Sequence, residues 1–400
     1  MKRLLTILCT LLSVTVACGD LNESPGDDIQ WMQEHTEEYL GDHQWRRSQL
    51  EASMWRPELP YARKQLTAYG LANQGWDLLP EMTTEVAPVF PGGASGESTE
   101  FSTEVPTTRR EWLDLGEEVF WQMPMRRDTY VEWLVERPEL LEEIGVENHE
   151  DGSLQGLVQF QDSRGQDRVG ITCGFCHGEG GVAGQARRDL DLGLGRAVFN
   201  EAHNRSGDEF ASWGPGRVDV TDDAVSDPLQ IPDLWGVRHQ SHINASGVVE
   251  LATPAALAIR FETQYILGHS LESRPNRVLT WALAMYVLSL EYPDHQPDMS
   301  SKGAAIFEAN CTACHNPDSG FSGGLVDGAL LSGDGQAALS PFRGTGMLKV
   351  PALVGVKNGA PYLHNGQYQT LRALLEDGHP YGTPMEQEDI DEVLNFLNTL

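Results

Sequence analysis

The pattern Cys-x-x-Cys-His occurs twice in this chain of 400 residues, at residues 173–177 and 311–315. In such a motif two thiols bond covalently to the vinyl groups of a c-type haem, and the adjacent histidine lies under the iron. We therefore predict two covalently bound c-type haems. The predicted attachment residues are Cys173, Cys176, Cys311 and Cys314, and the predicted proximal iron ligands are His177 and His315.

Other interpretations of the motifs are a thioredoxin-like redox pair, a zinc site and a chance disulfide. Of the six cysteines, Cys9 and Cys18 lie in the N-terminal segment, and the other four all fall inside the two motifs. Four thiolates could hold zinc together, but zinc spacing does not explain a histidine directly after both pairs. The cysteine distribution therefore favours haem.

The first 18 residues have the features of a secretory signal. A basic start at residues 1–3 precedes an apolar run at residues 4–16, which is too short to span a membrane as a helix. The Ala17-Cys18 junction resembles a bacterial lipobox, which predicts a lipid on Cys18; the alternative is simple cleavage and release. Either way we expect an exported protein of the periplasm or cell envelope, in contact with membrane only through that lipid.

The charge balance excludes some partners. The chain has 28 basic and 59 acidic side chains, which gives a formal net charge of −31. A negative field of this size repels nucleic acid and anionic lipid, and it would steer a basic redox partner such as a small cytochrome that donates electrons. Solubility, or adaptation to a saline habitat, is the alternative explanation of the charge.

Periodicity divides the chain behind the signal into three parts. Residues 19–107 are acidic and poorly periodic, which predicts a tether and a loosely structured N-terminal region whose tryptophans pack on the rest. Helical spacing then predicts a first cytochrome c-like haem domain at 108–295 and a second at 296–400. The expected fold class is mainly α, with two cytochrome c-like helical haem domains in tandem and long irregular loops.

The two predicted domains repeat each other beyond the haem motifs. Residues 231–238 (Ile-Pro-Asp-Leu-Trp-Gly-Val-Arg) match residues 350–357 (Val-Pro-Ala-Leu-Val-Gly-Val-Lys). Further on, Gly-His precedes a closing helix in both halves, at His269 and at His379, in the same register. These features follow in the same order in both halves, so we infer a duplicated haem domain.

The repeat suggests distal iron ligands on the side of each haem opposite the proximal histidine. His269 would serve the first haem and His379 the second; the alternative is that each Gly-His only forms a turn and caps a helix. The competing sulfur ligands are Met285 for the first haem, and Met347 and Met385 for the second. Other histidines could also lie near a haem: His203, His239 and His242 near the first, and His364 near the second.

A glycine-rich loop at residues 213–219 (Trp-Gly-Pro-Gly-Arg-Val-Asp) carries a single cation, Arg217. Glycines allow the backbone to approach a haem edge, and a guanidinium binds a carboxylate bidentately. We therefore predict that Arg217 binds a haem propionate. The alternative is an ordinary turn with a surface salt bridge.

Residues 348–353 and 359–366 resemble the C-terminal haem domain of the bacterial di-haem cytochrome c peroxidase and MauG-like family. The loop at 213–219 is similar to one in di-haem relatives that include rubber oxygenases. The resemblance covers roughly residues 111–400. It implies that the haem on the second motif receives electrons and that hydrogen peroxide is reduced at the haem on the first.

The resemblance does not supply a catalytic residue. Glu250 and Glu262 lie in the region where the family's peroxidases carry a glutamate, but the surrounding residues do not match. The expected function is therefore electron transfer between haems with peroxidase-type activity at the first haem. The alternative is a pure electron carrier with two six-coordinate haems and no catalytic activity.

Overall fold

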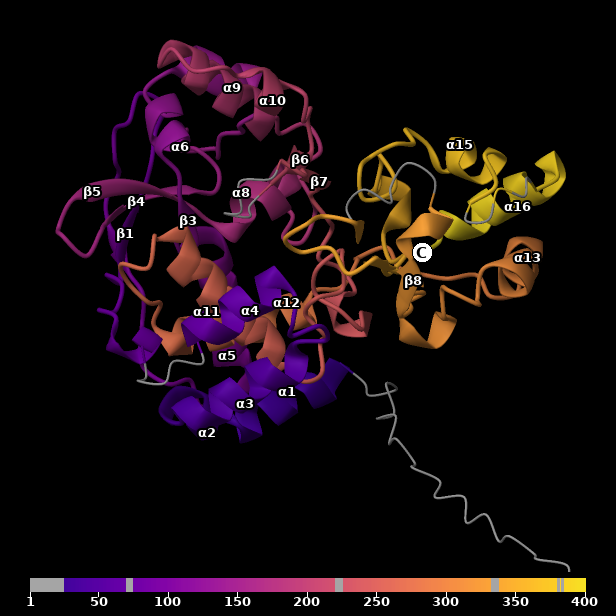
Figure 1. Ribbon diagram of the computed structural model, residues 1–400, viewed down its shortest axis with the longest axis horizontal. Helices are drawn as coiled ribbons and strands as arrows, with labels where there is room; N and C mark the ends of the chain where they lie inside the picture. The colour runs from indigo at the N-terminus through magenta and orange to yellow at the C-terminus, as the bar shows by residue number, and fades with distance from the viewer. Residues whose placement is uncertain (1–24, 70–74, 220–225, 332–337, 380–381, 383–384) are drawn as a thin grey trace, which may run out of the picture.

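The computed structural model describes residues 25–69, 75–219, 226–331, 338–379, 382 and 385–400. The chain forms two lobes side by side (Figure 1). The larger contains every labelled element up to α12, and the smaller contains α13, α15, α16 and β8. The fold is mainly helical, as predicted from the sequence. No helix among the described residues is both long enough and apolar enough to cross a lipid bilayer.

The elements are few and short outside the helical core. The α-helices are α1 (Pro25–Glu34), α2 (Thr36–Gly41), α3 (His43–Ser53), α4 (Pro60–Tyr69), α5 (Arg109–Gln122), α6 (Thr129–Leu134), α7 (Pro138–Glu143), α8 (Cys173–His177), α9 (Leu192–Ala202), α10 (Asp208–Ala211), α11 (Ala255–Gly268), α12 (Arg277–Ser289), α13 (Lys302–Asn310), α15 (Leu371–Glu376) and α16 (Gln387–Leu397). The strands are β1 (Glu85–Pro88), β2 (Thr99–Glu100), β3 (Arg126–Arg127), β4 (Leu157–Gln161), β5 (Asp167–Ile171), β6 (Arg217–Val218), β7 (Leu229–Gln230), β8 (Leu325–Asp327) and β9 (Met347–Lys349).

The N-terminal region is more ordered than its composition suggests. Helices α1 to α3 pack on α11 and α12, and Ile29, Met32 and Tyr39 are completely buried there. The Tyr39 ring stacks on Trp281 at 4.2 Å between centroids. The expectation of a loosely structured region is therefore wrong for residues 25–69, because an apolar stripe of these helices completes the core around α12.

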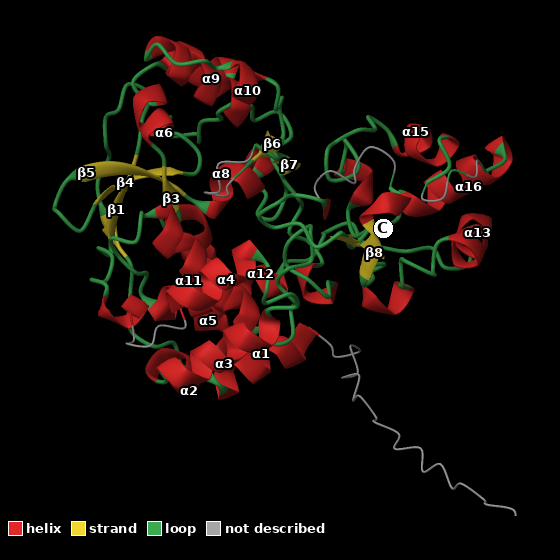
Figure 2. Cartoon of the chain, in the orientation of Figure 1, coloured by secondary structure: helices red, strands yellow, loops and turns green. Residues whose placement is uncertain are grey.

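A five-stranded antiparallel sheet in the order β2-β1-β4-β5-β3 lies in the larger lobe (Figure 2). Its central hairpin turns at Asp162, whose side chain accepts hydrogen bonds from the backbone N–H groups of Arg164 and Gln166. Gly165 takes the left-handed conformation at φ 72° that closes the turn. The prediction of helices and irregular loops missed this sheet, whose strands β3, β4 and β5 lie between α5 and the first haem motif in the chain.

The helix pair that closes each half is built in the same way. In the larger lobe α5 crosses α12 at Gly116, where a Cβ would lie 2.3 Å from the Ala282 carbonyl oxygen. In the smaller lobe α13 crosses α16 at Gly303, where a Cβ would lie 2.1 Å from the Glu392 carbonyl oxygen. Only glycine permits such backbone contact, so the duplication inferred from sequence extends to the way the helices pack.

We expect Gly303→Ala to destabilise the smaller lobe by ~1–3 kcal/mol, because the added methyl group meets backbone that cannot move independently. The measurement is thermal or chemical unfolding of the haem-loaded protein. Gly324→Ala is the matched control, since a Cβ there has no neighbour within 4 Å. Equal stability of the two variants would show that the α13–α16 crossing tolerates separation.

Candidate haem sites

The first haem motif forms the short helix α8, which packs against the end of α5. A Cβ on Gly174 would lie 2.3 Å from the Trp121 ring, and one on Gly178 would lie 2.6 Å from it. Behind the helix, a Cβ on Gly156 would lie 2.2 Å from the backbone nitrogen of Phe175. The glycines allow α8 to be held from two sides, which fixes where both thiols and the histidine lie.

The matching segments 231–238 and 350–357 are called here the first and the second repeat element. The backbone of the first repeat element orients His177. Its Nδ1 donates a hydrogen bond to the Pro232 carbonyl at 2.9 Å. Burial lowers the pKa of His177 to about 4, although this hydrogen bond opposes the shift. The imidazole is therefore neutral with its proton on Nδ1, and Nε2 keeps the lone pair that an iron ligand requires.

Arg188 and Asp233 hold the repeat element next to the haem motif. The Arg188 guanidinium donates to the Asp233 carboxylate at 2.8 Å and to the Ile231 carbonyl. The same carboxylate accepts from the backbone N–H of Ala186 at 2.8 Å. Burial raises the pKa of Asp233, and the guanidinium opposes that effect. These contacts fix the position of the Pro232 carbonyl.

The second motif repeats this arrangement. Ser301 caps α13 by accepting from the backbone N–H of Ala304 at 3.1 Å, and the helix delivers Cys311 at its C-terminal end. His315 Nδ1 donates to the Phe321 carbonyl at 2.8 Å. The Pro351 carbonyl lies beside the imidazole, and burial lowers the pKa of His315 overall. Pro351 occupies the same place in its repeat as Pro232 does in the first.

Both motifs therefore fit a covalent haem. Each histidine commits Nδ1 to the backbone and leaves Nε2 for iron, and all four motif cysteines carry free thiols. A haem bound there supplies one-electron chemistry, with its potential set by the axial ligands and by their hydrogen bonds. Comparison of the two halves of the sequence found the repeat element but did not predict that its proline carbonyl lies beside the proximal histidine. The signal for this role was that the element follows the haem motif in both halves.

The two repeat elements also contact each other. Gly236 and Gly355 adopt the same left-handed conformation, at φ 72° and φ 73°. A Cβ on Gly355 would lie 2.8 Å from the Trp235 ring, and one on Gly236 would lie 3.1 Å from the Ala352 Cβ. Trp235 is buried at this contact, where its Nε1 donates to the Ala183 carbonyl at 3.3 Å. The two repeat elements, each of which lies beside one proximal histidine, thus meet at the boundary between the lobes.

Comparison with known proteins agrees with this geometry. Residues 300–400 match the cytochrome c family model. The chain is also 26% identical over 281 residues to the cytochrome c peroxidase Ccp of Escherichia coli (strain K12). In sequence the chain is thus similar to a cytochrome c peroxidase. The match covers 61% of this chain and 57% of the Escherichia coli protein, so the chain spans little more than half of its cytochrome c peroxidase relative.

Two solved structures of other enzymes resemble this chain in fold. One is Kuenenia stuttgartiensis hydrazine synthase, with a TM-score of 0.37 and 17% identity over 77% of this chain and 96% of that chain. The other is the diheme peroxidase BthA from Burkholderia thailandensis E264, with a TM-score of 0.34 and 15% identity over 80% of this chain and 94% of that chain. Both likenesses are too loose to carry an argument.

Neither candidate glutamate has the contacts of a peroxidase acid. Glu262 is completely buried and binds Arg277, whose Nη2 donates to Oε1 at 2.7 Å. Arg277 also pairs with Asp77, which joins Arg46 and His43 in the same ion cluster. Glu250 lies in a backbone bridge with His242. Glu262 therefore ties the N-terminal region to α11 and α12.

His269 is engaged within the larger lobe. It caps the C-terminal end of α11, its Nε2 donates to the Pro124 carbonyl at 2.7 Å, and its ring stacks on Tyr265 at 4.1 Å. Burial lowers its pKa to about 4. These contacts connect α11 to the segment before β3. They do not support ligation of the first iron by His269, which stays a prediction.

His379 has space beside it. It lines a cavity of about 350 Å³ in the smaller lobe together with Leu331, Leu363, Tyr368 and Leu374. The Asp377 carboxylate also lines this cavity, whereas Cys311, Cys314 and His315 do not. Ligation of the second iron by His379 therefore stays a prediction. Met385 packs on the apolar cluster that includes Cys311, and so it remains the competing ligand of the second iron.

Arg217 lies where the lobes meet. Its Nη1 donates to the Asn365 carbonyl at 3.2 Å, in the turn after the second repeat element. The neighbouring Gln230 donates its backbone N–H to the His364 carbonyl at 2.8 Å. The glycine-rich loop therefore joins the first half to the second, and the propionate role of Arg217 stays a prediction.

The remaining candidate haem ligands differ in how deeply their side chains are buried. Met285 lies completely buried in α12 and belongs to the core, whereas His203 is exposed and its ring lies tilted against that of Phe199. His242 is buried, and burial lowers its pKa to about 4; its Nε2 has no hydrogen-bond partner. Met347 lies in β9 at the lobe boundary.

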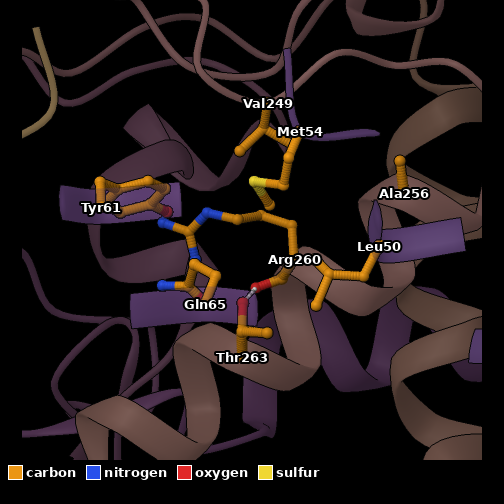
Figure 3. Close-up of a pocket in the computed structure, with 8 residues that line it drawn as sticks. All are labelled: Leu50, Met54, Tyr61, Gln65, Val249, Ala256, Arg260 and Thr263. Carbon is orange, nitrogen blue, oxygen red and sulfur yellow. Dashed lines mark hydrogen bonds between the residues drawn. The ribbon is translucent and has the colours of Figure 1, made fainter. Parts of the chain in front are cut away.

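An enclosed cavity beside the N-terminal helices is not a haem site. Figure 3 shows Arg260 extending past Gln65 and Tyr61, with the Thr263 hydroxyl donating to the Arg260 carbonyl at 2.9 Å. Its volume of about 10 Å³ leaves room for no more than one water molecule. This cavity is therefore far too small for a porphyrin.

Proposed function

We propose that this protein is a di-haem c-type cytochrome that passes electrons from the haem on the second motif to the haem on the first, where hydrogen peroxide is reduced. The observation that carries this proposal is the contact between the repeat elements at Trp235, because the first element orients His177 through its Pro232 carbonyl and the second begins beside His315. The relationship to a cytochrome c peroxidase supports peroxide as the substrate.

The residues of the chain would divide the work. Cys173 and Cys176 would hold the haem where peroxide reacts, with His177 as its proximal ligand. Cys311 and Cys314 would hold the haem that accepts electrons, with His315 as its proximal ligand. Reducing one peroxide to water consumes two electrons and two protons, so a donor must deliver electrons repeatedly. The net charge of −31 favours a basic donor such as a small cytochrome.

We also propose that the protein is exported to the periplasm or cell envelope, where a lipid on Cys18 would anchor it. The support is the signal-like pattern of residues 1–18, which lie outside the described residues, and the need for haem attachment outside the cytoplasm. Mass spectrometry of the mature N-terminus tests this directly. A chain that keeps Met1, or that begins after Cys18, would contradict the lipid anchor.

A steady-state peroxide assay with a reduced small cytochrome tests the enzymatic proposal. We expect turnover by the haem-loaded protein and none by a Cys173→Ser/Cys176→Ser variant, although the second haem of that variant should still accept electrons from the donor. Absence of turnover by the unaltered protein, with both haems reducible, would reject the peroxidase function.

A pure electron carrier is the second candidate, and one observation favours it. Cleavage of peroxide needs an acid-base group above the iron, and Glu262 is already bound to Arg277. In a carrier both haems would be six-coordinate and inert toward peroxide, and electrons would still cross the contact at Trp235.

A further inference from the structure

One segment of the larger lobe contacts the proximal histidine of the first motif and the turn that holds the proximal histidine of the second. At its start, the Pro232 carbonyl accepts from His177 Nδ1. At its end, the His239 carbonyl accepts a hydrogen bond from the hydroxyl of Ser322, which belongs to the smaller lobe. The segment between them includes Trp235, which contacts the second repeat element. A single stretch of backbone therefore lies behind both haem motifs.

The turn at residues 319–322 links this segment to the second histidine. Ser322 is buried, and its hydroxyl also lies 2.6 Å from the Ser319 carbonyl. Between these two serines, the Phe321 carbonyl accepts from His315 Nδ1 at 2.8 Å. The turn thus presents one carbonyl to the iron ligand and is fastened to the first half by its last residue.

Close packing reinforces the attachment. Gly320 adopts φ 60°, and a Cβ built on it would lie 2.7 Å from the His239 ring. Phe321 also has a positive φ of 56°, which costs a non-glycine residue energy and persists only where the surroundings hold it. The His239 side chain and carbonyl therefore constrain the peptide that carries the Phe321 carbonyl.

Hydrogen bonding at Nδ1 changes how strongly an imidazole binds iron. A firmly held acceptor makes the imidazole a better electron donor, which stabilises the oxidised iron and lowers the reduction potential; a looser acceptor has the opposite effect. Control of the Phe321 carbonyl is thus control of the potential of the second haem.

We propose that His239 and Ser322 are positioning residues through which the first half of the protein sets the reduction potential of the second haem. The inference rests on the proposed electron transfer between the haems, since it concerns the potential of the haem that would receive electrons. It assigns to His239 a role in tuning the second haem, whereas its position in the sequence suggested a place near the first.

The test is a redox titration of the full-length, haem-loaded protein, in which the visible spectrum reports the oxidation state of each haem. Ser322→Ala should raise the reduction potential of the second haem and leave that of the first unchanged. Ser319→Ala is the matched control, because that hydroxyl bonds only to the Asn316 and Ser322 carbonyls within the same half. It should shift the potential less.

His239→Ala keeps the backbone acceptor but removes the ring that packs on Gly320, so it should shift the same potential upward. This second variant serves if Ser322→Ala does not load both haems. An unchanged potential of the second haem in either fully loaded variant overturns the inference. The titration uses no peroxide. The shift in potential and the turnover of peroxide are therefore measured independently, and either can fail without the other.

Discussion

Replacing Cys173 and Cys176 by Ser is expected to reduce the covalently bound haem from two per chain to one. Each motif pairs its own thiols with its own oriented histidine, so loss of one pair leaves the other site intact. The measurement is the haem absorbance of the denatured protein in alkaline pyridine, divided by the protein concentration. Haem that survives denaturation is covalently bound, which separates it from adsorbed cofactor.

The matched variant is Cys311→Ser/Cys314→Ser, which should retain only the first haem. Changing all four cysteines should remove covalent haem completely. A haem content that stays the same after either double substitution would mean that the altered motif never carried one, and a zinc content that falls instead would favour the metal alternative.

Arg277→Met is expected to destabilise the protein by ~3–5 kcal/mol, because it leaves a buried charge without its partner. Glu262 is completely buried, and Arg277 bridges it to Asp77 from the N-terminal region. The measurement is equilibrium unfolding in urea, with limited proteolysis to show whether the N-terminal helices detach first.

Arg110→Met is the control for this charge removal. Arg110 also pairs with a carboxylate, that of Asp114, but both side chains are largely exposed, and exposed ion pairs contribute little. We expect its stability to stay within ~0.5 kcal/mol of the unaltered protein. Similar losses in both variants would show that the buried cluster is no more important than a surface pair.

Sequence alone predicted the parts of the fold that rest on local signals. Asn276 caps α12 by accepting from the backbone N–H of Val278, and Ser301 caps α13 in the same way. A polar residue directly before a helical run is a signal that the sequence itself carries. The internal repeat likewise located the elements behind both haem motifs. Short-range hydrogen bonds and repeated residues need no knowledge of the rest of the chain.

The sequence predicted less where distant partners decide the structure. Helix α1 has a weak pattern by itself, and its Met32 is buried against α12, where the Trp281 indole donates to the Met32 carbonyl. The sheet depends in the same way on pairing between β1 and β4, which are far apart in the chain. Glu262 lies in the region where the family's peroxidases carry a glutamate, and only the fold places Arg277 against it.

The most direct test of the central proposal is a single turnover. Protein in which only the second haem is reduced is mixed with one equivalent of hydrogen peroxide, and the visible and EPR spectra of both haems are followed. The proposal predicts that the second haem becomes oxidised as the peroxide disappears, starting from a first haem with an open or displaceable site. A second haem that stays reduced, unconsumed peroxide and persistent low-spin signals from the first haem would contradict it.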